Sequence, residues 1–124
     1  MDPSPETRRL LISATLTAQA RRHPGTSSGA GDLLALAREL SEETGAIERA
    51  YRFRFDPPYP GVTAGPQNVG RTSRLLLACR VSDHDGTPIG VVFTALIADR
   101  PPQVSVAPAE ASIPEDWRPP DDFR

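Results

Sequence analysis

The clearest hydrophobic pattern in the chain is a stripe of apolar residues at helical spacing. Its members are Leu33, Leu36, Ala37 and Leu40. Asp32 precedes them as a candidate N-cap, and Gly45 follows them where a left-handed residue commonly ends a helix. The pattern predicts a helix from Leu33 to Thr44.

A different pattern occupies the segment before it. Between Leu11 and Ala20 apolar and polar residues alternate, and several of them are β-branched. This alternation is typical of a half-buried strand. The Ser4-Pro5-Glu6 start, with good helix formers such as Ala and Gln after it, favours a helix instead. Of the two, we expect the strand.

Three later segments also alternate or are apolar throughout. The region from Ile47 to Phe55 alternates aromatic and charged residues, which predicts a strand with one wet face. Two further strands, Thr72–Ser82 and Pro88–Ala98, are joined by Asp83-His84-Asp85-Gly86, and the Asp-Gly pair predicts a hairpin. Pro88–Ala98 is apolar on both faces, so we expect it to be central.

The remaining segments predict loops. Glycine and small residues crowd His23–Gly31, and proline and glycine crowd Asp56–Val69. From Pro101 onward, prolines and a late Trp117 predict an irregular tail. The expected organisation is an α+β domain over residues 1–100 and a proline-rich tail over 101–124. One principal helix packs on a mostly antiparallel sheet in the order β-α-β-β-β.

Composition limits the classes of partner. The net charge is −2, which gives no electrostatic footprint for nucleic acid or an anionic membrane. All fourteen basic residues are arginines, and GC-rich coding explains this better than phosphate recognition because they are scattered. The single cysteine, Cys79, lies in an apolar run and is expected to be buried. With neither a signal peptide nor a membrane span in the pattern, we expect a cytoplasmic protein.

One group of residues carries chemistry. Glu39, Glu42 and Glu43 share one face of the predicted helix, where like charges repel. They also occupy its predicted last turn, where the helix dipole disfavours carboxylates. A divalent cation would resolve both costs, and Mg²⁺ or Mn²⁺ held there could activate water against a pyrophosphate. Arg38 lies four residues before Glu42 and can orient it.

The stretch Arg38-Glu39-Leu40-Ser41-Glu42-Glu43-Thr44-Gly45-Ala46 resembles the second half of the Nudix box, the signature of metal-dependent pyrophosphohydrolases. The resemblance implies a Nudix-like fold that hydrolyses a nucleoside diphosphate linked to another moiety. It implies that Glu39, Glu42 and Glu43 bind the metal, and that Glu42, Glu43 and Arg38 serve catalysis. The implied contacts to a nucleotide-like substrate are Gly25, Gly29, Arg52 and Arg54.

The first half of the box departs from the family. Ala30 stands where a glutamate is required and Pro24 where a glycine is required. Fewer residues precede the box than in typical members, so the fold would be N-terminally shortened. Many members use a further acidic residue downstream, for which the candidates are Glu110, Glu115 and Asp116.

These departures leave an alternative open. The chain could be a non-catalytic Nudix-like module, or an unrelated α+β binding or interaction module whose apolar hairpin pairs with a partner or forms a homodimer. Asp83-His84-Asp85 could bind metal, but turn chemistry explains it better. Arg49, Arg52 and Arg54 alternate with aromatic residues and could bind phosphates and stack bases, although a half-exposed strand explains them better.

Overall fold

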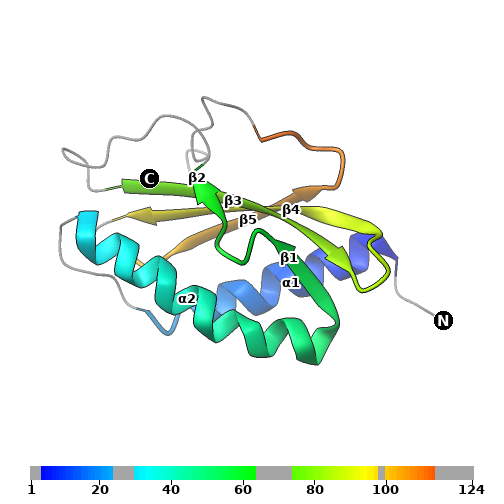
Figure 1. Ribbon diagram of the computed structural model, residues 1–124, viewed down its shortest axis with the longest axis horizontal. Coiled ribbons are helices and arrows are strands. Elements are labelled where there is room, and N and C mark those ends of the chain that lie inside the picture. Colours follow the sequence, from blue (N-terminus) through cyan, green and yellow to red (C-terminus); the bar gives the residue numbers. More distant parts are fainter. Residues whose placement is uncertain (1–3, 24–29, 64–73, 98–99, 114–124) are drawn as a thin grey trace.

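The computed structural model describes residues 4–23, 30–63, 74–97 and 100–113, with the backbone alone for residues 30–32, 34, 63 and 74. Within these ranges the chain forms two helices followed by five strands of one antiparallel sheet. Both helices lie on the same side of the sheet (Figure 1). The predicted α+β class is confirmed, but the chain opens α-α rather than β-α.

The first helix, α1 (Pro5–Ala20), occupies the segment for which we expected a strand. Ser4 caps it by accepting the Thr7 N–H at 3.1 Å, and Pro5 stands in the first turn, where its missing N–H costs nothing. Ile12, Leu16 and Ala20 are buried. The strand prediction was wrong because a spacing of four residues satisfies both a two-residue and a helical period.

The second helix, α2 (Ala30–Tyr51), is longer at both ends than predicted. It begins two residues before Asp32, which is therefore not the N-cap. It also runs through Gly45 to Tyr51, so residues 47–51 are helical and not part of a strand. Its stripe of buried residues continues past Leu40 to Thr44, and this tertiary packing outweighs the helix-breaking tendency of glycine.

The chain leaves α2 through Arg52, whose backbone adopts a left-handed conformation with φ 60°. Strand β1 (Phe53–Asp56) follows at once, with Phe53 and Phe55 buried and the residues between and after them exposed. The predicted alternation is confirmed over these four residues. The left-handed position expected at Gly45 is found at Arg52 instead.

The predicted hairpin is confirmed. Strands β3 (Arg74–Asp83) and β4 (Pro88–Ile97) pair antiparallel, and β4 lies between β3 and β5. In the turn, Asp83 Oδ1 accepts the N–H groups of Asp85 and Thr87, each at 2.9 Å. Gly86 adopts φ +86°, as this turn requires.

Two further strands complete the sheet. The short β2 (Val62–Thr63) interrupts the predicted loop and pairs with β3, beside the segment of β3 that pairs with β1. Strand β5 (Gln103–Pro108) pairs with β4. The expectation of an irregular tail from Pro101 is therefore wrong for these residues, and the domain boundary at residue 100 does not hold. Trp117 lies outside the described residues.

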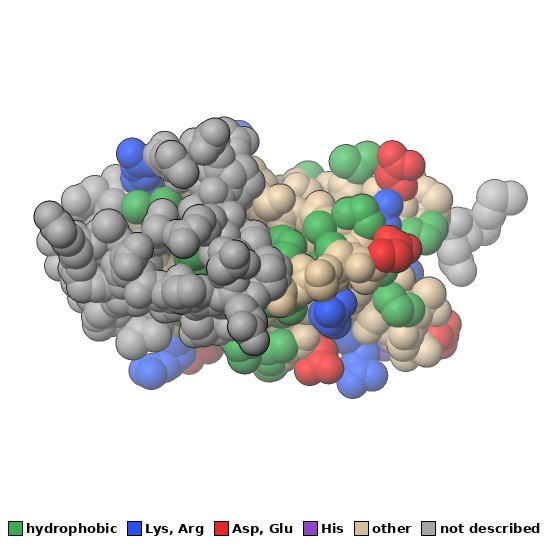
Figure 2. All heavy atoms as spheres, turned by 90° about the horizontal axis from the view of Figure 1, so that it is seen from above, with side chains coloured by type: hydrophobic (Ala, Val, Ile, Leu, Met, Phe, Trp, Pro, Cys, Tyr) green, Lys and Arg blue, Asp and Glu red, His purple; other side chains and the backbone are tan. Residues whose placement is uncertain are grey.

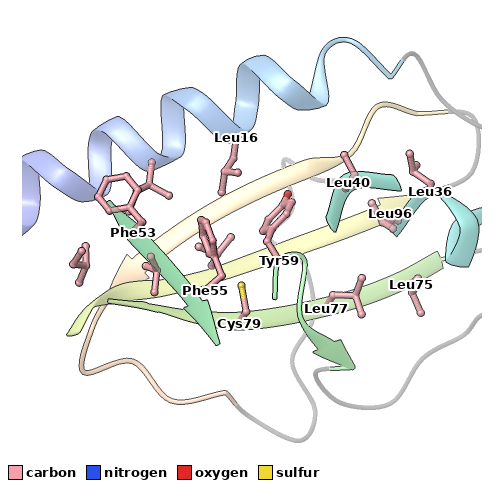
Figure 3. Packing of buried hydrophobic residues seen from close by; sticks show 14 of the residues in the cluster. Leu16, Leu36, Leu40, Phe53, Phe55, Tyr59, Leu75, Leu77, Cys79 and Leu96 are labelled. Atoms are coloured by element: carbon pink, nitrogen blue, oxygen red, sulfur yellow. The ribbon is translucent and has the colours of Figure 1, made fainter. Parts of the chain in front are cut away.

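The main core lies between the helices and the sheet (Figure 3). Helix α1 packs against β4 and β5, and α2 packs against β1, β3 and β4. Cys79 is fully buried in this core, as predicted, and burial raises the pKa of its thiol to about 12. Tyr59 is also buried there; its hydroxyl accepts a hydrogen bond from Thr94 at 3.3 Å.

The opposite face of the sheet carries two smaller apolar clusters. Ala78, Val91 and Phe93 form one with Ala107, Ala111 and Ile113, and Leu76 and Ala95 form the other with Ile97. In the described part of this surface, acidic, basic and apolar side chains are interspersed (Figure 2). Ala111 and Ile113 extend the packed domain beyond β5.

The backbone of Gly61 lies directly against β3. Its φ of +107° disfavours any L side chain, and a Cβ there would lie 1.9 Å from the Ala78 carbonyl oxygen. Because that oxygen belongs to the strand backbone, it cannot move aside without disturbing the sheet. Gly61 thus allows the segment between β1 and β2 to cross β3 closely enough to seat Tyr59.

We therefore expect Gly61→Ala to lower the free energy of unfolding by about 3 kcal/mol or more, measured by urea denaturation. Gly86→Ala is the control. Gly86 also has a positive φ, but an added Cβ would meet nothing within 4 Å, so Gly86→Ala should lower the free energy of unfolding by only about 1–2 kcal/mol. Equal losses in the two variants would contradict the close approach of Gly61.

A second substitution tests the continuity of α2. Gly45 is in the helix interior, and a Cβ there would make an ordinary 3.6 Å contact with Arg49 Nη1. Gly45→Ala should raise the free energy of unfolding by about 0.5–1 kcal/mol. A helix that ended at Thr44, with Gly45 left-handed, would give a loss of about 1 kcal/mol instead. Chemical denaturation distinguishes the two signs.

Candidate functional site

The three glutamates of the candidate metal site lie in the middle of α2, where they take different surroundings. Glu39 and Glu42 are exposed, whereas Glu43 is half-buried against α1. Among the described residues, no three His, Cys, Asp or Glu side chains come together in a way that could hold a metal ion. The three carboxylates that were expected to converge therefore do not form such a group in this structure.

Glu43 instead belongs to a polar junction between the two helices. Its Oε2 accepts from Gln19 Nε2 at 3.1 Å and lies 3.0 Å from His23 Nε2. Because an ionised carboxylate only accepts, the proton of this second hydrogen bond is on His23 Nε2. We call Gln19, His23, Glu43 and Thr44 the interhelical junction.

The inner part of the junction is buried. Gln19 is 2% exposed and Thr44 is 1% exposed. The Thr44 hydroxyl lies 2.7 Å from the Leu40 carbonyl oxygen and 3.2 Å from Gln19 Oε1, and it can donate to either. Gln19 is therefore satisfied at both ends of its amide, as burial requires.

Electrostatics favours the ionised form of Glu43. The hydrogen bond from His23 is the largest cause that lowers the pKa of this carboxyl below its ordinary value of 4.5. Desolvation opposes it, and the hydrogen bond from Gln19 lowers the pKa further. Stability from this group is therefore complete above the unfolded pKa and is lost as the pH falls through the folded pKa.

The extension of α2 also changes the charge argument for a metal. Glu39, Glu42 and Glu43 do not lie in the last turn, because the helix continues to Tyr51, and Arg49 is the basic residue in that turn. This is the placement that the helix dipole favours. No ion pair joins Arg38 to Glu42 within the described ranges, so the expected orienting contact is not formed.

The other residues predicted from the sequence to bind substrate or metal lie in different parts of the chain. Gly25, Gly29, Glu115 and Asp116 lie outside the described residues, and Glu110 is exposed just after β5. Asp83 shapes its turn, as predicted, and its Oδ2 pairs with Arg8 Nη1 at 3.5 Å. The Arg8 guanidinium also lies 4.9 Å from the centre of the Phe53 ring.

Arg52 and Arg54 lie at the end of the molecule where α2, β1 and the β3–β4 turn meet. A hollow of about 440 Å³ opens there. We call it the arginine hollow, and its lining is Gly45, Glu48, Arg49, Phe53, Arg54 and His84. A neighbouring hollow of about 360 Å³ includes Arg8 and Arg52 and shares Phe53 and His84 with it.

Two sequence signals could have located these features. The apolar stripe of α2 continues at helical spacing through Thr44 to Ile47, which favours a longer helix. Gln19 occurs three residues after Leu16 and seven after Ile12, which is the spacing of the buried face of α1, where a polar residue requires a partner. The partner itself depends on the tertiary packing of the two helices.

No model of a known protein family matches the chain, and no curated protein or solved structure matches it either. Within the described ranges, neither helix combines the length and apolar character that a membrane-spanning segment needs.

Alanine substitutions at adjacent glutamates test the role of the junction. Glu43→Ala leaves Nε2 of the buried Gln19 with only the Leu40 carbonyl oxygen, 3.5 Å away, so the free energy of unfolding should fall by about 1–2 kcal/mol. Glu42→Ala is the matched control and should change stability by less than about 0.5 kcal/mol. The difference, measured by urea denaturation, should shrink as the pH falls below 4.5 through the folded pKa of Glu43.

A metal site built from Glu39, Glu42 and Glu43 gives the opposite pattern. Mg²⁺ would then raise the Tm of the wild-type chain, and both substitutions would remove that increase to a similar extent. This outcome would show that the junction is not the main role of Glu43.

Proposed function

We propose that this chain is a non-catalytic binding module that associates with another polypeptide through the outer face of α1, and that the partner is a second copy of the chain. The observation that carries the proposal is the exposure of two adjacent leucines. Leu10 is 67% exposed and Leu11 is 41% exposed. Both lie in a helix without any charged residue from Leu10 to Ala20.

Between Leu10 and Ala20, helix α1 has no charged residue on the side that faces solvent or on the side that faces the sheet. Ile12 and Leu16 are buried on the inner side, and Ala14 and Ala18 are exposed on the outer side. We call Leu10, Leu11, Ala14 and Ala18 the uncharged face. A helix that packs one side on a sheet ordinarily has charged residues on the other, and a helix that is apolar all round is ordinarily buried.

Helix α2 provides an internal comparison. It packs on the same face of the same sheet, and its exposed residues include Arg38, Glu39, Glu42 and Arg49. Packing on this sheet is therefore compatible with a charged outer surface. The uncharged face of α1 needs a separate reason, and contact with a partner supplies one.

The surface beside the uncharged face is concave. A groove of about 470 Å³ runs between the helices, and its lining is Ala14, Thr15, Ala18, Gln19, Arg22, Ile47 and Tyr51. The α1 wall consists mainly of small side chains, whereas Ile47 and Tyr51 supply apolar surface on the α2 wall. A leucine-sized side chain from a partner helix can enter such a groove.

The sequence of α1 is complementary to itself in the antiparallel direction, which is why we assign a second copy as the partner. With Ala14 at a two-fold axis, Leu10 of each copy lies level with Ala18 of the other. Glu6 lies level with Arg22 of the other copy, and Arg21 is the residue next to it, so opposite charges meet at both ends. The small Ala14 lets the two helices approach closely, and their dipoles run antiparallel.

The metal-dependent hydrolase implied by the resemblance at Arg38–Ala46 stays a prediction. The geometry gives more support to a binding module, because Glu43 is already engaged by His23 and Gln19. Glu39 and Glu42 remain exposed and without a hydrogen-bond partner among the described residues.

The test is the oligomeric state at several protein concentrations, by sedimentation equilibrium. The interface is small, so we expect a dimer with a dissociation constant on the order of micromolar. Ala14→Glu places two carboxylates together at the axis and should weaken dimerisation at least about tenfold. Ala46→Glu, at an exposed alanine in the C-terminal third of α2, is the matched control and should leave the dimer unchanged.

Charge reversal separates the antiparallel arrangement from any other apolar contact. Glu6→Arg should weaken the dimer, and combining it with Arg21→Glu and Arg22→Glu should restore it. A wild-type chain that stays monomeric to about 1 mM, or a dimer indifferent to Ala14→Glu, would contradict the proposal.

A further inference from the structure

The arginine hollow concentrates positive charge that the fold does not use. Arg49 and Arg54 are exposed cations on its wall, and neither forms an ion pair with any described residue. A Cβ on Gly45 would lie 3.6 Å from Arg49 Nη1, so the guanidinium group of Arg49 lies beside Gly45, which also lines the hollow. His84 closes the hollow from the β3–β4 turn.

The one carboxylate in the lining is already committed. Glu48 Oε2 accepts the Phe55 N–H at 3.0 Å and so covers the open edge of β1. Asp83, on the adjacent turn, pairs with Arg8. These two acidic groups therefore have partners of their own, whereas the guanidinium groups of Arg49 and Arg54 have none among the described residues.

We infer that the arginine hollow is a binding site for an oxyanion, the phosphate or carboxylate group of a small molecule. Two guanidinium groups can each offer a fork of N–H donors to such a group, and an imidazole N–H can add a third direction. The negative end of the α2 dipole disfavours an anion near the last turn, which contributes Arg49 to the hollow. The positive charges of Arg49 and Arg52 offset this effect of the dipole. The inference is independent of the self-association proposed for α1.

The fold does not depend on a ligand in the arginine hollow. Phe53 forms an apolar wall beneath the arginines and is itself 2% exposed, so the fold is complete without a ligand. An oxyanion would gain charge-assisted hydrogen bonds without any rearrangement of the core.

The chain offers a simple reporter, because His23 and His84 are its only histidines. His84 lines the hollow. His23 lines neither this hollow nor the neighbouring one, because it follows the C-terminal end of α1, whereas Arg8, which lines the neighbouring hollow, lies near the start of that helix. Inorganic phosphate, pyrophosphate and citrate are titrated separately at fixed pH and constant ionic strength, and the imidazole NMR signals of both histidines are followed.

The expected result is a saturable shift of the His84 signals with His23 unmoved. Arg49→Gln and Arg54→Gln should each raise the dissociation constant about tenfold. Arg100→Gln, an exposed arginine beyond the other end of β4, removes the same charge and should leave binding unchanged. Saturation by the phosphates alone assigns a phosphate ligand, and saturation by citrate alone assigns a carboxylate ligand.

The inference is overturned if chloride moves His84 as much as the oxyanions do, or if His23 and His84 shift together. It is also overturned if Arg100→Gln weakens binding as much as Arg54→Gln, because general charge screening would then account for the effect. Circular dichroism melting of each variant confirms that it is folded before it is titrated.

Discussion

The continuity of α2 through Gly45 is the constraint on which the rest of the structure depends. Glycine in a helix interior costs about 1 kcal/mol, yet the buried stripe that reaches Thr44 holds the helix on the sheet beyond that point. The extra turns bring Glu48 to the edge of β1, where its carboxylate accepts the Phe55 N–H. Because the helix is longer, the left-handed residue that ends it is Arg52. Strand β1 starts at the next residue and pairs with β3.

The same continuity changes the role that can be expected of Glu39, Glu42 and Glu43. Three carboxylates in a last turn would be opposed by the helix dipole, and a cation would be needed to gather them. In a helix that ends at Tyr51 they lie in the interior, and Arg49 occupies the end that favours a cation. The residue types and spacing of Arg38–Ala46 keep their resemblance to the Nudix box. The part of the argument for a metal that rests on the helix dipole, however, is removed by seven more helical residues.

Local signals predicted the parts of the fold that are stabilised locally. The β3–β4 hairpin follows from two apolar runs and an Asp-Gly turn, and it was found as predicted. Helix α1 was missed because its buried residues, four apart, fit two periods, so only the Ser4 cap distinguished them. Strand β5 was missed because its six residues lie among prolines and are held by pairing with β4. The interhelical junction joins α1 to α2, and no local pattern shows which residue satisfies Gln19.

The contrast between the two helices separates folding from association. Both pack on one face of one sheet, and for α1 the buried Ile12 and Leu16 already supply the contacts that folding needs. The exposed Leu10 adds nothing to that core, and in water an exposed leucine on an uncharged surface favours association. Since α2 shows that this architecture accepts charged residues on its outer surface, the fold does not explain their absence from residues 10–20 of α1. In the dimer that we propose, the second copy covers this surface.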